Sequence, residues 1–205
     1  MSGLAASYDA LGRHAEALEL REQTLARQKA ELGPDHPDTL VNMNRLAISY
    51  QALGRPAEAL ELHQEALARQ KTKLGPDHPD TLTSRLGVAS ALVQLSRGAE
   101  AVADCRRAAE TWEKRGATDA DSLYNAACFR AVTAAALRSA DQSPAGAKQA
   151  EAEAEADRAM AWLERAVAAG HRNAAWMAAD HDLNALWHRA AFKELMGRLG
   201  ASKPK

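Results

Sequence analysis

The stretch "LGPDHPDTL" stands at residues 32–40 and again, letter for letter, at residues 74–82. Its glycine is suited to end a helix in the left-handed conformation, and the proline that follows prevents the helix from continuing. Asp35 or His36 can cap the next helix, Pro37 opens it, and Asp38 interacts favourably with its dipole. The stretch therefore predicts a tight connection between two antiparallel helices, made twice with a spacing of 42 residues.

The repetition extends far beyond this connection. Residues 4–40 align with residues 46–82 without a gap, and 28 of the 37 positions are identical. A match at a fixed period is typical of an array of supersecondary units. Within the second copy, apolar residues follow helical spacing up to Gly54 and resume it after Pro56. Each unit is therefore predicted to be two helices around a glycine turn.

Composition and charge agree with a helical chain and exclude several functions. Aromatic residues make up only 4% of the 205 residues, while alanine, leucine, glutamate and arginine dominate. Lys plus Arg is 26 against Asp plus Glu at 27, and no basic block is present, which argues against nucleic-acid and membrane-surface binding. No apolar run is long enough to cross a bilayer and no export signal is visible. With two cysteines in no metal-binding pattern, Cys105 and Cys128, we expect a cytoplasmic protein.

The repeated pattern "LAxSYxALGRxAEALELxxxxLARQKxxLGPDHPDTL" resembles the tetratricopeptide repeat in its 42-residue, kinesin-light-chain-like form. The positions that carry the resemblance are Leu46, Ala47 and Tyr50 on the first helix, Gly54 in the turn, and small residues on the second helix. The resemblance implies an all-α fold, a right-handed α-α superhelix of about four helix pairs that ends in a short helical C-terminal cap.

This resemblance divides the chain into four parts. Residues 1–115 form three units, the first of them truncated, and residues 116–170 form a degenerate fourth helical pair with a loop at 138–148. Residues 171–200 are expected to be short capping helices, because an array needs a cap for the open face of its last unit. We expect residues 201–205 to be a disordered tail, and the truncated first unit to favour a homo-oligomer or the exchange of repeats between chains.

The C-terminal part, from "YNAACFRA" onward, also resembles the repeat-bearing tails of bacterial Ser/Thr protein kinases. The kinase motifs themselves do not occur in the chain. Two functions follow from these resemblances. The first is a non-catalytic scaffold that binds a peptide or a partner protein in a concave groove. The alternative is a regulatory or assembly module detached from a larger enzyme such as a kinase.

The family's groove lies along the first helix of each unit, and carrying its positions over gives a set of candidate partner-binding residues. Amide side chains in this set can hydrogen-bond a peptide backbone, and arginine can pair with a carboxylate. The set comprises Asn44, Arg45, Ile48, Gln51, Thr83, Ser90, Gln94, Asn125 and Phe129, with Val41 and Ser122 beside them.

Catalysis and metal binding have weaker support in the sequence. No catalytic motif occurs, so we expect no enzyme activity and no cofactor. The strings "DHPD" at residues 35–38 and "DHD" at residues 180–182 resemble metal ligands but are better explained as helix caps. A metalloenzyme using His181, Asp182 and His188 is the rival hypothesis. The four tryptophans, all in the C-terminal half, are interpreted as packing residues unless one of them is exposed to a partner.

Overall fold

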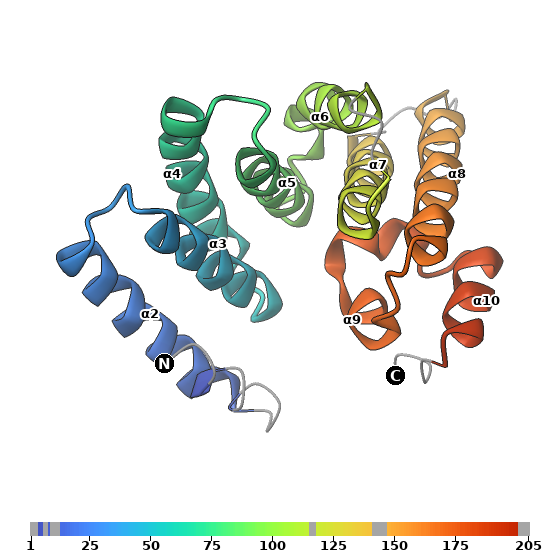
Figure 1. Ribbon diagram of the computed structural model, residues 1–205. Coiled ribbons are helices and arrows are strands. Elements are labelled where there is room, and N and C mark those ends of the chain that lie inside the picture. The colour runs from blue at the N-terminus through green and yellow to red at the C-terminus, as the bar shows by residue number, and fades with distance from the viewer. Residues whose placement is uncertain (1–3, 6–7, 9–12, 115–117, 141–146, 201–205) are drawn as a thin grey trace. The chain divides into compact units, whose positions relative to one another are not determined.

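The computed structural model describes residues 4–5, 8, 13–114, 118–140 and 147–200, and the described part contains helices and no strands (Figure 1). This confirms the predicted all-α fold. The helices are α2 (His14–Glu31), α3 (Pro37–Ala52), α4 (Pro56–Leu74), α5 (Pro79–Gln94), α6 (Val102–Lys114), α7 (Ala120–Ala140), α8 (Ala147–Ala168), α9 (Ala174–Ala179) and α10 (Ala190–Arg198), with 3-10 turns η1 (Gly98–Glu100) and η2 (His181–Leu186).

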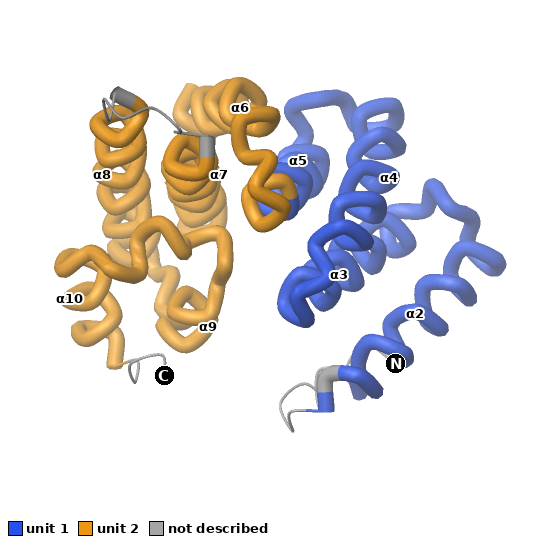
Figure 2. The backbone as a smooth tube through the Cα atoms, turned by 180° about the vertical axis from the view of Figure 1, so that it is seen from behind, with its two compact units in different colours: residues 1–91 blue, residues 92–205 orange. Residues whose placement is uncertain are grey.

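The chain forms two compact units, residues 1–91 and residues 92–205 (Figure 2). The division falls inside α5, within the third predicted repeat, and the predicted four-part organisation of the chain stays a prediction. The predicted loop at 138–148 is shorter where the structure describes it, because α7 continues to Ala140 and α8 begins at Ala147. The rest of that loop and the tail at 201–205 lie outside the described residues. None of the described helices is long and apolar enough to span a membrane.

The repeated connection is built as its residues predict. Gly33 and Gly75 have φ of 90° and 87°, a conformation that only glycine adopts without strain. His36 caps α3, because its Nδ1 accepts a hydrogen bond from the backbone N–H of Asp38 at 3.2 Å, and His78 does the same for Asp80. The "DHPD" histidines are therefore capping groups. In each ring the Nδ1 atom is used by the backbone of the following helix.

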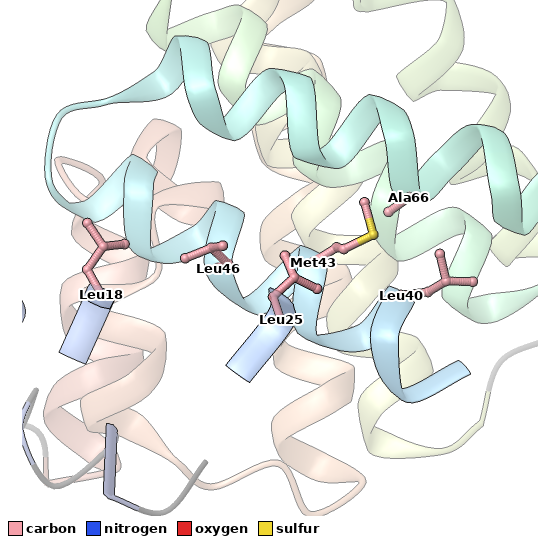
Figure 3. Close-up of a cluster of buried hydrophobic side chains, with 6 residues drawn as sticks. All are labelled: Leu18, Leu25, Leu40, Met43, Leu46 and Ala66. Atoms are coloured by element: carbon pink, nitrogen blue, oxygen red, sulfur yellow. The ribbon is translucent and has the colours of Figure 1, made fainter. Parts of the chain in front are cut away.

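The core of the first unit is made by leucines at helical spacing on neighbouring helices. Leu18 and Leu25 of α2 pack against Leu40, Met43 and Leu46 of α3, with Ala66 of α4 beside them (Figure 3). Burying a side chain of this size contributes about 1.5–3 kcal/mol. The amphipathic pattern of the repeat is therefore what brings its helices together.

The turn between the two helices of a repeat differs between the second repeat and the third. Gly54 has φ of 71°, and Ser96, which stands 42 residues later, keeps the same left-handed conformation at φ of 60°. After Ser96 the chain forms η1 before α6 begins at Val102, so the second helix of the third repeat starts later than its pattern predicts. Gly98 lets η1 approach α7 closely, because a Cβ there would lie 2.8 Å from the Cα of Ala136 on α7.

In the second unit, α7 is buried along almost its whole length between α6, α8, η1 and η2. A charged cluster in this interior joins three helices. Arg130 of α7 donates to Glu113 of α6 at 2.7 Å and to Glu155 of α8 at 2.8 Å, and Arg130 and Glu155 are both buried. Because each buried charge has a partner, the cluster avoids the cost of an isolated ion.

The expected capping segment is present as three short elements, α9, η2 and α10. Leu183, Leu186 and Leu195 are buried, and Arg138 of α7 donates to the backbone oxygen of Ala185 at 3.1 Å. Arg189, at the start of α10, pairs with Glu153 of α8 at 2.6 Å and also with Asp157. The segment is therefore held on α7 and α8 by apolar contacts and by ion pairs.

Candidate partner-binding surface

The solvent-facing side of α3 carries part of the predicted binding set. Arg45 and Ile48 are one helical turn apart, and both are exposed, Ile48 by 56%. Within the described residues, the Arg45 guanidinium makes no ion pair and no side-chain hydrogen bond. Helix α5 runs beside α3, since Asn44 Nδ2 donates to Ser84 Oγ at 2.6 Å, and it adds the exposed Thr83. These three residues form what we call the α3–α5 surface: Arg45, Ile48 and Thr83.

Three other predicted residues are buried, and the prediction that they face a partner needs correction. Asn44 and Ser90 are 7% and 5% exposed, and Phe129 is fully buried in the second unit. The Asn44 amide is occupied by Ser84 and His63 instead of being free for a peptide backbone. Gln51, Gln94 and Asn125 are half-buried. Their role in binding stays a prediction.

Asn44 belongs to a buried polar cluster that the sequence did not reveal. His63 of α4 lies with Nδ1 2.9 Å from Asn44 Oδ1 and with Nε2 3.3 Å from Gln51 Oε1. Asn44 donates to Ser84 of α5, and Ser84 Oγ donates to Gln70 Oε1 of α4 at 2.5 Å. We call these five residues from three helices the polar cluster: Asn44, Gln51, His63, Gln70 and Ser84.

Protonation in the polar cluster follows from this geometry. Because the Asn44 NH2 group donates to Ser84, its oxygen faces His63, and the His63 Nδ1–H donates to it. Burial lowers the pKa of His63 to about 4, because removing the ring from water disfavours its charged form. The imidazole is therefore neutral at physiological pH. His63 is therefore a structural group between helices and not an acid or base at the surface.

The rival metal site does not form as predicted. Within the described residues, the close group of potential ligands is Cys128, Asp180 and Asp182, and it contains neither His181 nor His188. Both histidines are exposed, and the His181 ring packs on Trp187 with 5.7 Å between ring centroids. The sequence proposal of His181, Asp182 and His188 acting together is therefore not supported by their positions.

The close group at Asp180 has a structural role in the cap. Asp180 Oδ1 accepts from the backbone N–H of Asp182 at 3.0 Å, and Oδ2 accepts from the Tyr124 hydroxyl at 2.6 Å. Burial raises the pKa of Asp180, of the Tyr124 hydroxyl and of the Cys128 thiol. The group therefore fixes the start of η2 against α7.

One of the four tryptophans is largely exposed, as a contact with a partner would require. Trp176 is 51% exposed, whereas Trp112 is buried, and Trp162 and Trp187 are half-buried. The Trp176 ring lies 5.0 Å from the Tyr124 ring, and Tyr124 stacks on His171 at 4.3 Å. Trp176 is thus held in place by neighbouring rings while one side of it remains accessible.

Comparisons with known proteins give a family and a related structure. A family model described as a tetratricopeptide repeat matches residues 1–72 and 41–114, more than half of the chain. The solved structure of a kinesin-light-chain protein of Podosopora anserina with nearly identical TPR-like repeats is similar to this chain, with 25% sequence identity and a TM-score of 0.44. The match covers 82% of this chain and 92% of the Podosopora anserina chain. A point variant of that protein gives 24% identity, the same coverages and a TM-score of 0.46. No curated protein matches the chain.

Proposed function

Since the chain belongs to the tetratricopeptide repeat family, we propose that it is a non-catalytic module that binds a peptide or a partner protein on its α3–α5 surface. The observation that carries the proposal is the exposure of Ile48, at 56%, on a helix whose Leu40, Met43 and Leu46 are buried. Its neighbour Arg45 is a charged group with which a carboxylate of the partner can pair.

The surface suggests the kind of contact that a partner makes. An extended peptide can place an apolar side chain on Ile48 and a carboxylate at Arg45, while the Thr83 hydroxyl offers a polar contact from α5. Tetratricopeptide repeats generally bind proteins, and this arrangement supports the same use here. A second point of contact in the other unit is Trp176, whose exposed aromatic ring is of the type enriched at binding hot spots.

The alternative is a regulatory or assembly module of a larger enzyme such as a bacterial Ser/Thr kinase. Its support is the resemblance of residues 124–131 and of the C-terminal segment to the tails of such kinases. In the second unit these stretches pack together, because α7 contacts both α8 and η2. A bacterial source, a cytoplasmic location and a homo-oligomer also stay predictions, and the last is measured by light scattering coupled to size-exclusion chromatography.

Site-specific photocrosslinking tests the proposal. A photoreactive amino acid replaces Ile48 in one variant and Glu61, an exposed residue of α4, in the control. Crosslinking in extracts of the source cell is expected to give a discrete adduct at position 48 and none at position 61. The partner identified in the adduct is then titrated against the variants Arg45→Glu and Ile48→Asp.

We expect each of these two substitutions to weaken binding by at least about tenfold, which corresponds to about 1.4 kcal/mol. Glu61→Gln should leave the affinity unchanged. Equal adducts at positions 48 and 61, or an affinity that neither substitution lowers, would show that the α3–α5 surface is not where the partner binds.

A further inference from the structure

The first two repeats bury leucines at equivalent positions, so these leucines do not distinguish α2 from α4. Leu18 and Leu25 of α2 correspond, 42 residues later, to Leu60 and Leu67 of α4, and all four are buried. An apolar contact is not directional. These leucines therefore do not determine whether α2 or α4 packs in a given position.

One polar contact is repeated as well. Asn42 of α3 donates to Gln28 of α2, and Ser84 of α5, at the equivalent position, donates to Gln70 of α4. Each pair consists of a glutamine on the second helix of one repeat and a small polar residue on the first helix of the next. This contact is therefore also available to either helix.

The two repeats differ where the polar cluster is built. His63 stands where the first repeat has Arg21, and Gln51 stands where it has Asp9. His63 is 2% exposed, and its ring fills the space left by Gly87 of α5, because a Cβ at position 87 would lie 2.3–2.5 Å from the ring atoms. With α2 in place of α4, the longer and charged Arg21 would have to enter the space that the His63 ring fills, and taking a charge out of water is costly.

The charged residues near the repeated connection also differ between α4 and α2. Glu65 of α4 pairs with Lys29 of α2 at 3.2 Å, and Lys73 of α4 donates to the backbone oxygen of Asp35 at 3.1 Å. The first repeat carries Gln23 and Glu31 at the two equivalent positions. In a shifted arrangement one ion pair would be lost, and a glutamate would replace the lysine near Asp35.

We propose that the polar cluster specifies the register of the repeats: it accepts α4 between α3 and α5, and it rejects α2 of the same chain or of a second copy. His63 donates to Asn44, Asn44 donates to Ser84 and Ser84 donates to Gln70, so one chain of hydrogen bonds crosses three helices. Buried polar groups can define register in this way because the wrong neighbour leaves them without partners.

A refolding experiment measures register directly. Two full-length preparations with different affinity tags are unfolded in denaturant, mixed and refolded together, and capture on one tag quantifies the other. A second sample, folded separately and then mixed, reports ordinary association and is subtracted. Because subunits that associate without exchanging helices give the same background in wild type and in each variant, the rise above wild type measures chains that exchanged helices while folding.

The double variant Asn44→Leu/His63→Leu removes the specific hydrogen bonds and keeps the repeated Ser84–Gln70 contact. We expect its exchanged fraction to rise at least about tenfold above wild type, equivalent to a loss of about 1.4 kcal/mol of discrimination. His63→Gln, which keeps a donor for Asn44, should behave as wild type. Leu67→Ala, which destabilises the same helix and leaves the polar cluster intact, should also behave as wild type.

A second variant keeps the test decisive if the buried double variant fails to fold. Arg21→His/Gln23→Glu/Glu31→Lys gives α2 the distinguishing residues of α4, at positions that are exposed or half-exposed. Because α2 then becomes an acceptable replacement for α4, exchange should rise in this variant too. The proposal is overturned if the exchanged fractions of the foldable variants equal wild type, or if Leu67→Ala exchanges as much as they do.

Discussion

At the scale of single residues, a few side chains separate two repeats that are otherwise nearly the same. The residue at position 63 is a histidine in the second repeat, and its equivalents are Arg21 and Cys105. In the second repeat this histidine is buried, neutral and bonded to Asn44. The same residue therefore sets the contacts of α4 and makes the first unit sensitive to acid.

Acid should destabilise the first unit through His63. An unfolded histidine titrates near 6.5, whereas burial lowers the pKa of folded His63 to about 4. Between these values the unfolded state binds the extra proton, so the free energy of unfolding decreases as pH falls from 6.5 towards 4. The full effect is about 3 kcal/mol, from about 1.4 kcal/mol for each unit of pKa difference.

This effect is measured by urea unfolding followed by circular dichroism between pH 7 and pH 4. His63→Gln should lose less stability over this range than wild type, because glutamine binds no proton. Carboxylates titrate in both proteins and cancel in the comparison. Parallel pH profiles for the two proteins would show that His63 takes up its proton equally well in the folded and unfolded states, and so that its folded pKa is not lowered.

At the scale of helices, short elements depend on the long ones that they cover. Helix α10 runs only from Ala190 to Arg198, a length that is marginal for an isolated helix in water. Phe192, Leu195 and Met196 are buried, and Arg189 pairs with two acidic residues of α8. The position of α10 is therefore decided by packing and by charge, more than by its own helix propensity.

Removing the Arg189 ion pairs should loosen α10 selectively. Arg189→Gln leaves Glu153 with Arg138 and Gln149, and leaves Asp157 without its arginine. Because these groups are partly exposed, we expect a loss of about 1 kcal/mol. Hydrogen exchange followed by mass spectrometry should show faster exchange of the α10 amides. The control is Arg198→Gln, an exposed position in the last turn of α10, where the exchange rates should stay unchanged.

At the scale of the whole molecule, two units each bury their own apolar residues. All four tryptophans, Trp112, Trp162, Trp176 and Trp187, belong to the second unit, whereas helices occur in both. Tryptophan fluorescence therefore reports the second unit, and circular dichroism reports the whole chain. This difference between probes makes the stability of the units measurable separately.

A core truncation in the first unit should separate the two signals. Leu25→Ala removes a leucine that packs against α3, at a cost of about 2–5 kcal/mol. We expect the midpoint of the circular dichroism transition in urea to fall, while the fluorescence midpoint stays close to that of wild type. Leu163→Ala, in the core of the second unit, should lower the fluorescence midpoint instead. Coincident shifts of both probes in both variants would mean that the chain unfolds as one unit.

Local sequence predicted local structure well, because the residues that decide it are neighbours. Gly33, His36 and Pro37 end one helix and begin the next within five positions, and the contacts that do this are made inside the same stretch. Arg45, Ile48 and Thr83, which the family resemblance assigns to the groove, are exposed, and their role in binding stays a prediction. The burial of Asn44, Ser90 and Phe129 did not follow from that pattern.

The sequence by itself determined the helices, their turns and the period at which they recur, because glycine, proline and apolar spacing act over a few residues. Only the tertiary structure decided which polar side chains are enclosed. Asn44 contacts Ser84, forty residues away, and His63 on another helix. The residue type alone does not show whether the partner of a polar side chain is water or a distant side chain. Burial is a property of the neighbours that folding assembles, so it emerges only when the helices have packed.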